Sequence, residues 1–144
     1  MATEVIEQPL TLDVYGFSGI VTDKNYGARA FQLSGKMWSV VKSLDLKNKG
    51  RNIWIYESGD AVFAGVELEE TPLNTGLEHR TITLPRYGYY KHVGPYSLIR
   101  QAGNTLRQNL IQKELRPMLP YIEIYGHWHS DESKLETELI SAIG

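Results

Sequence analysis

One succession of residue patterns occurs twice along this chain, and it limits the possible folds more than any other feature. An alternating, strand-like segment, LTLDVYGFSGIV, precedes the helical segment LSGKMWSVVKSL, and the strand-like segments NIWIY and AVFAGVEL follow. The same order returns as RTITLPRYGYYKHV, GPYSLIRQAGNTLRQNLIQKEL, YIEIY and KLETELISAI. A shared order over four elements predicts one strand–helix–strand–strand unit used twice.

Short matches between the halves support this duplication. Tyr15-Gly16-Phe17 resembles Tyr87-Gly88-Tyr89, Ile53-Trp54-Ile55-Tyr56 resembles Ile122-Glu123-Ile124-Tyr125, and Val66-Glu67-Leu68 resembles Thr137-Glu138-Leu139. We expect one α+β domain over residues 1–144, with repeats at about 8–70 and 78–144. The two units should join into a mainly antiparallel sheet, with helices near residues 30–46 and 96–114 on one face. The opposite face should then form a groove.

Side-chain alternation along the strands predicts which residues line this groove. Val62, Ala64 and Val66 are apolar and should pack under the first helix, which directs Phe63 and Glu67 the other way. We assign the isoleucine pairs of the two middle strands to the helix side as well, so that the residues between them face the groove. The predicted groove residues are Tyr15, Trp54, Tyr56, Phe63, Tyr87, Tyr89 and Tyr125, with the carboxylates of Glu67, Glu123 and Glu138.

Composition excludes several functions. The net charge of −2 gives no reason to expect direct binding to nucleic acid. The chain has no cysteine, which rules out disulfides and thiolate metal sites, and no apolar run long enough for a membrane span. The acidic N-terminus lacks an export signal, so we expect a cytoplasmic protein without membrane association.

The segments KHVGPYSLI, IEIYGHW and the final TEL strand resemble the GyrI-like family, also called AraC-type effector-binding or bacterial multidrug-binding domains. The resemblance covers nearly the whole chain, and the duplicated plan is also that family's plan. It implies a concave, aromatic-lined pocket with a buried glutamate that binds lipophilic organic cations. Many relatives carry a DNA-binding helix-turn-helix module, for which we see no room before Leu10 or after Gly144, so the chain is similar to standalone members.

The family position makes Glu138 the expected main anionic anchor, with Glu67 and Glu123 in support. A flat cation would stack on the aromatic walls and lie near this carboxylate. We therefore expect a small-molecule binding module for lipophilic, cationic aromatic compounds, rather than an enzyme.

Two alternatives remain open. Some GyrI-like relatives hydrolyse reactive small molecules, and a pocket glutamate with a raised pKa could serve as general acid or base. The family's namesake inhibits DNA gyrase, so a protein partner, either gyrase or a transcription factor, is the other alternative. His127 and His129 have the spacing of a metal pair, but no third ligand is evident nearby, and we expect neither a metal nor a cofactor.

Overall fold

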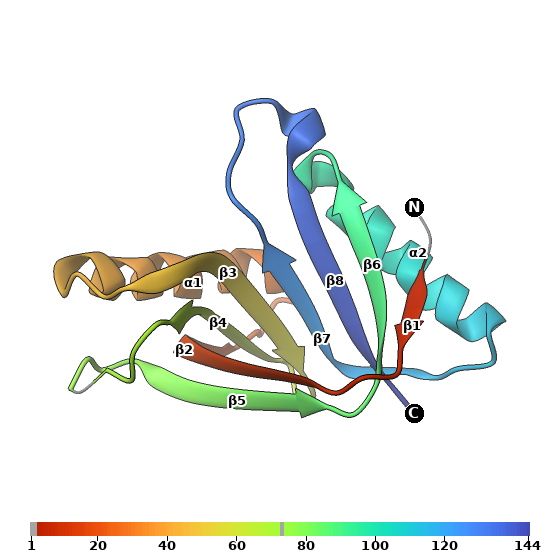
Figure 1. Ribbon diagram of the computed structural model, residues 1–144, viewed down its shortest axis with the longest axis horizontal. Helices are drawn as coiled ribbons and strands as arrows, with labels where there is room; N and C mark the ends of the chain where they lie inside the picture. Colours follow the sequence, from red (N-terminus) through yellow and green to blue (C-terminus); the bar gives the residue numbers. More distant parts are fainter. Residues whose placement is uncertain (1–2, 73) are drawn as a thin grey trace.

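The computed structural model describes residues 3–72 and 74–144, which form one eight-stranded sheet and two α-helices (Figure 1). The strands are β1 (Glu4–Ile6), β2 (Leu10–Ile20), β3 (Asn48–Glu57), β4 (Ala61–Leu68), β5 (Glu78–Leu84), β6 (Tyr87–Val93), β7 (Pro117–Tyr125) and β8 (Glu136–Ile143). The helices are α1 (Tyr26–Ser43) and α2 (Ile99–Gln112). Every strand pairing is antiparallel, so the predicted α+β class is confirmed.

The sheet order is β1-β6-β8-β7-β3-β4-β2-β5. The strands β2-β3-β4 and β6-β7-β8 are thus arranged in the same way on the two sides of the β3–β7 seam. At this seam Trp54 pairs with Glu123, and the isoleucines on either side of Trp54 pair with those on either side of Glu123. Each half contributes one helix between its first and second of these strands, as the repeated pattern predicted.

The segment RTITLPRYGYYKHV forms two strands rather than one bent strand. Pro85 and Arg86 separate β5 from β6, because proline lacks the N–H that a continuous ladder needs. Strand β5 pairs with β2 in the first half, while β6 pairs with β8 in the second. The proline therefore marks the passage of the chain from one half to the other.

The helices begin and end a few residues from the expected positions. Helix α1 starts at Tyr26 because the side chain of Asn25 accepts a hydrogen bond from the Ala28 N–H at 3.2 Å and caps the helix. A 3-10 turn, Tyr96–Leu98, precedes α2. No helix in the described ranges is long and apolar enough to cross a membrane.

Both helices lie on one face of the sheet, as expected (Figure 1). Helix α1 packs over β4 and β2, and α2 packs mainly over β6 and β8. Under α1 lie Val62, Ala64 and Val66, and under α2 lies Leu139. The helices therefore cover the flanking strands and leave the central strands β3 and β7 between them.

The opposite face of the sheet carries a core to which neither helix contributes. Its buried side chains come from six strands and pack on one another: Leu12, Val14, Ile53, Ile55, Phe63, Leu84, Ile122, Ile124 and Ile140. The isoleucine pairs of β3 and β7 belong to this core, and our assignment of them to the helix side is wrong. Apart from Glu123, the paired segments 53–56 and 121–125 are apolar or aromatic on both faces, so alternation alone does not tell which face a helix covers.

Candidate ligand-binding site

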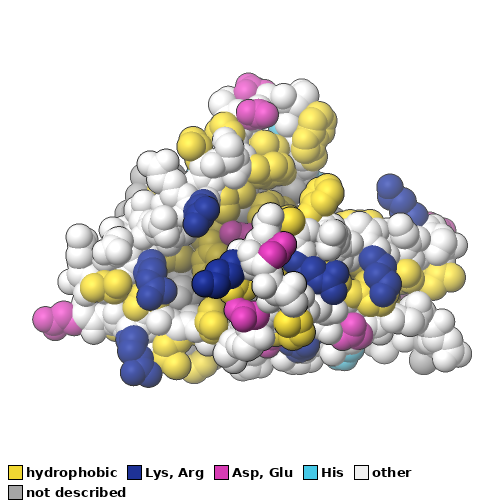
Figure 2. Space-filling model, turned by 180° about the vertical axis from the view of Figure 1, so that it is seen from behind, with side chains coloured by type: hydrophobic (Ala, Val, Ile, Leu, Met, Phe, Trp, Pro, Cys, Tyr) yellow, Lys and Arg dark blue, Asp and Glu magenta, His cyan; other side chains and the backbone are white. Residues whose placement is uncertain are grey.

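A pocket of about 1420 Å³ opens between the two helices, above the central strands. It lies on the helix-bearing face, whereas we expected a groove on the opposite one. Hydrophobic side chains line a hollow near the middle of this face (Figure 2). Each helix supplies a wall, and the floor is formed by alternate residues of β3 and β7.

Glu123 lies at the centre of the floor. On β7 it alternates with Tyr121 and Tyr125, which places the three side chains on the same face. Tyr56 reaches the same point from β3, where it pairs with Tyr121, and Trp54 pairs with Glu123 itself. The register of the central seam thus brings one acid and four aromatic residues together.

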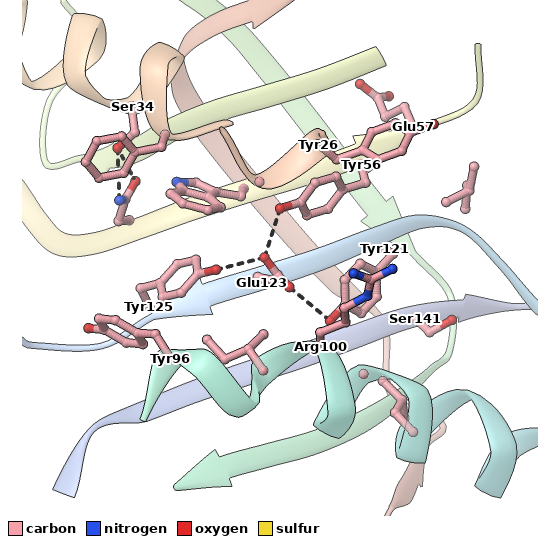
Figure 3. A pocket seen from close by; sticks show the side chains of 18 of the residues that line it. Tyr26, Ser34, Tyr56, Glu57, Tyr96, Arg100, Tyr121, Glu123, Tyr125 and Ser141 are labelled. Carbon is pink, nitrogen blue, oxygen red and sulfur yellow. Dashed lines mark hydrogen bonds between the residues drawn. The ribbon is translucent and has the colours of Figure 1, made fainter. Parts of the chain in front are cut away.

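Three tyrosine hydroxyls donate hydrogen bonds to the Glu123 carboxylate (Figure 3). Tyr56 and Tyr125 donate to Oε1 at 3.0 and 2.8 Å, and Tyr121 donates to Oε2 at 3.2 Å. Both carboxylate oxygens are therefore satisfied, although only 8% of the residue is exposed. The arrangement holds the acid in one orientation, with its charge directed into a mostly aromatic pocket.

Burial and hydrogen bonding act on the pKa of Glu123 in opposite directions. Burial raises the pKa, since it disfavours the charged form, and the three tyrosine hydrogen bonds lower it. The net effect is a raised pKa. Burial and the negative charge of Glu123 together raise the pKa values of Tyr56, Tyr121 and Tyr125, so that these hydroxyls remain protonated donors.

The aromatic rings of the pocket form two groups of contacting rings. The Trp54 and Tyr125 ring centroids are 4.7 Å apart, and Tyr96 meets Tyr125 edge-on at 5.5 Å. Tyr56 and Tyr121 stack at 5.7 Å. Such contacts favour flat apolar ligands without requiring one pattern of hydrogen bonds.

The structure brings four of the ten predicted site residues together in this pocket, namely Trp54, Tyr56, Glu123 and Tyr125. The other six lie elsewhere. Tyr15 stacks on His79 with ring centroids 4.5 Å apart, outside the pocket. Phe63 is buried in the opposite core, against which Tyr87 and Tyr89 also pack.

Glu67 and Glu138 occupy a polar cluster on the face opposite the pocket. Arg51 binds Glu67 at 2.6 Å and lies 3.6 Å from Glu138, which also accepts a hydrogen bond from Tyr89 at 2.7 Å. The side chains of Arg51 and Glu138 are 37% and 34% exposed. Glu138 therefore has its own partners, and it is Glu123 that occupies the pocket.

The register explains why the sequence matches misplaced some residues. Tyr15 pairs with Val66 and faces the helices, whereas Tyr87 pairs with Ala142 and faces the opposite core. The Tyr-Gly match is therefore displaced by one residue, and such a displacement moves a side chain to the other face. In the second half, Gly88 occupies the position that corresponds to Tyr15.

Sequence reasoning missed several pocket residues. Tyr121 has the same parity as Glu123 and could have been included on that ground. Tyr26 and Trp38 of α1 and Arg100 of α2 lie on pocket-facing sides of the helices, which could not be identified once the groove was placed on the other face.

In the described ranges no group of three His, Cys, Asp or Glu side chains could hold a metal ion.

No protein-family model and no curated protein matches the sequence. Solved structures do match. The C-terminal domain of EcmrR superposes with a TM-score of 0.71 at 16% identity, over 100% of this chain and 99% of that domain. EcmrR in an EcmrR–DNA complex gives 0.74 at 16% identity, over 98% of this chain, which spans 57% of the EcmrR chain.

Two further structures are similar. SAV2435 bound to tetraphenylphosphonium gives a TM-score of 0.67 at 16% identity, over 100% of this chain and 94% of SAV2435. A hydrolase from Listeria innocua gives 0.56 at 11% identity, over 99% of this chain and 91% of the hydrolase. At these identities the likeness concerns the fold. The chain has the fold of the EcmrR C-terminal domain and SAV2435, the effector-binding-domain fold predicted by its resemblance to the GyrI-like family.

Proposed function

We propose that the pocket binds lipophilic organic cations that carry aromatic groups, with Glu123 as the anionic anchor. The observation that carries this proposal is a buried carboxylate whose hydrogen-bond partners are all neutral. Within the described ranges no Lys, Arg or His lies within 4.0 Å of it. An uncompensated buried charge is costly, and a bound cation would supply the missing counter-charge.

The aromatic walls supply the remaining affinity. A cation placed over the face of Trp54 or a tyrosine gains about 0.5–2 kcal/mol per contact, depending on how dry the site is. The tyrosine hydroxyls hold the carboxylate in place before the ligand arrives, so little ordering remains for the binding step. Stacking on flat rings also permits compounds of different shape to bind.

One structural neighbour supports the same ligand class. SAV2435 has this fold and binds tetraphenylphosphonium, a lipophilic cation with four phenyl rings. EcmrR, of which this chain spans 57%, has been solved with DNA. For the present chain we propose ligand binding alone, and any effect on a transcription factor or gyrase would follow from it.

The proposal is tested by titrating tetraphenylphosphonium and tetraphenylborate, which have nearly the same shape and opposite charge. All three tryptophans line the pocket, so quenching of their fluorescence reports binding, and calorimetry gives the affinity. Wild type should bind the phosphonium and reject the borate. Glu123→Gln should weaken phosphonium binding about 10- to 100-fold, the loss expected for a charge-assisted contact.

Glu138→Gln is the matched control, because it makes the same chemical change on the opposite face of the sheet. It should leave phosphonium binding unchanged. Equal affinity for the two ions, or an effect of Glu138→Gln as large as that of Glu123→Gln, would contradict the proposed site.

Hydrolysis is a second candidate function, favoured by the raised pKa of Glu123. A carboxyl group that keeps its proton closer to neutral pH can act as a general acid. The Listeria innocua hydrolase shares the fold at a lower TM-score of 0.56. Incubation with strained electrophiles such as epoxides, followed by mass spectrometry, would detect turnover. Loss of turnover in Glu123→Gln would support an enzyme, and recovery of unchanged compounds would support the binding role.

A further inference from the structure

The two helical walls of the pocket differ in character. Helix α1 presents aromatic side chains, with Tyr26, Phe31 and Trp38 among the lining residues. Helix α2 presents Arg100, Asn104 and Arg107. Spacings of four and three residues place these polar side chains on one helical face, so the α2 wall is basic along two turns.

Among the residues that the structure describes, none is a polar partner of the Arg100 or Arg107 side chain. Every other arginine in the described ranges contacts a hydrogen-bond acceptor: Arg51, Arg80 and Arg86 bind carboxylates, Arg29 contacts Gln32, and Arg116 contacts the Met118 sulfur. Neither α2 arginine makes a side-chain hydrogen bond or ion pair within the described part of the chain. Both arginines line the pocket together with its aromatic residues, and Figure 3 shows Arg100 on the α2 side of the cavity.

The pocket therefore contains opposite charges that do not neutralise each other. Arg100 and Glu123 line the same cavity but do not come within 4.0 Å, and the Glu123 oxygens are occupied by tyrosine hydroxyls instead. Lys and Arg side chains lie around the hollow in the space-filling view (Figure 2). Of the other acidic groups of the lining, Glu57 is bound by Arg80, and Asp60 accepts a hydrogen bond from Tyr26 at 2.5 Å.

We propose that the preferred ligand is amphoteric, with a cationic aromatic body over Glu123 and a carboxylate group bound by Arg100 and Arg107 on the α2 wall. This inference rests on the proposed function. A volume of about 1420 Å³ leaves room for both groups, since drug-sized ligands usually occupy pockets of about 300–1,000 Å³. Guanidinium groups bind carboxylates through paired N–H donors. The α2 wall should therefore favour a carboxylate over other groups by its geometry as well as by its charge.

Rhodamine B and its ethyl ester test this inference with the full chain. The two dyes share one cationic ring system, and only the acid carries a carboxylate. Arg100→Gln and Arg107→Gln should each weaken binding of rhodamine B about 3- to 10-fold, as measured by fluorescence anisotropy. Binding of the ester should stay unchanged or become tighter, because a repulsive charge has been removed.

Arg29→Gln is the matched control, since it removes the same charge from α1 outside the pocket lining and should leave both dyes unaffected. Equal losses for the acid and the ester, or no loss for the acid, would overturn the amphoteric inference. The proposed function is judged separately by the ester. If the ester binds to wild type and Glu123→Gln weakens that binding, the proposed cation site is supported whatever the arginine variants show. If neither dye binds, both proposals are contradicted.

Discussion

Replacing Glu123 by glutamine should stabilise the free protein at neutral pH, even though it weakens cation binding. Glutamine has nearly the same shape, so its carbonyl oxygen can accept the bonds from Tyr56 and Tyr125. Its amide nitrogen would then face the Tyr121 hydroxyl, which lies 3.2 Å from the carboxylate in wild type. The three polar contacts are kept, and the substitution removes only the buried charge.

The expected magnitude follows from the balance at the carboxylate. Its burial outweighs the three tyrosine hydrogen bonds, as the raised pKa of Glu123 indicates. We expect the variant to gain on the order of 1–2 kcal/mol in free energy of unfolding at neutral pH, a fraction of the cost of burying an unpaired charge. For a chain of 144 residues this corresponds to a rise in Tm of about 3–8 °C.

The gain should depend on pH with a definite sign. Because the folded-state pKa of Glu123 is raised, its contribution to stability is fully present below the unfolded-state pKa of about 4.3. That contribution is lost as the pH rises through the folded-state pKa. Glutamine does not ionise, so the difference in Tm between variant and wild type should be small near pH 4, grow with pH, and then level off.

Differential scanning fluorimetry across this pH range measures the effect. Tetraphenylphosphonium at 100 times its Kd should add about 2.7 kcal/mol to the free energy of unfolding of the wild-type protein and so raise its Tm. The same concentration should raise the Tm of the variant much less. A variant that is less stable than wild type at every pH would refute the reasoning. So would a difference in Tm that does not change with pH, since it would point to altered packing and not to charge.

Other substitutions and conditions give independent checks. Cation affinity should fall as the pH is lowered through the raised pKa of Glu123, because the protonated acid loses its attraction for the ligand; calorimetry at several pH values that finds constant affinity would argue against the anchor. Gly16→Ala should cost about 3 kcal/mol in urea unfolding, because the added Cβ would lie 1.9 Å from the Ala64 carbonyl oxygen. Gly35→Ala, whose new Cβ would meet no atom within 4 Å beyond the adjoining helix backbone, should instead stabilise α1 by about 0.5–1 kcal/mol, and similar effects of the two changes would exclude this packing explanation. Trp54→Phe should weaken dye binding a few-fold, since it reduces the aromatic surface beside Tyr125, and undiminished affinity by calorimetry would place the ligand away from Trp54.

The fold was predictable because its evidence is distributed along the whole chain. Helical periodicity, strand alternation and their repeated order are local signals, and each half supports the other. The antiparallel sheet and the placement of both helices on one face follow from that order. What local signals could not supply was the face on which the pocket lies, because Trp54 and Ile55 are both suited to burial.

The identity of the acid was harder to predict for a related reason. The short match between Val66-Glu67-Leu68 and Thr137-Glu138-Leu139 aligns two glutamates, but the ladder register gives a different correspondence. Trp54 and Glu123 occupy equivalent positions at the seam, and they pair with Ala64 and Leu139 respectively. Ala64 therefore corresponds to Leu139, and the preceding residue, Phe63, corresponds to Glu138. Only the strand pairing reveals this, since it depends on contacts between residues far apart in the sequence.

Trp54 and Glu123 face each other across the β3–β7 seam, at equivalent positions of the two halves. In a homodimer of half-length chains, one residue type would have to occupy both positions, so two acids would repel each other there or two indoles would leave the floor without charge. Joining the halves in one polypeptide removes this constraint, because each copy can then mutate alone. At this pair of positions the first half supplies an indole and the second an acid, which gives a two-fold scaffold a pocket without two-fold symmetry.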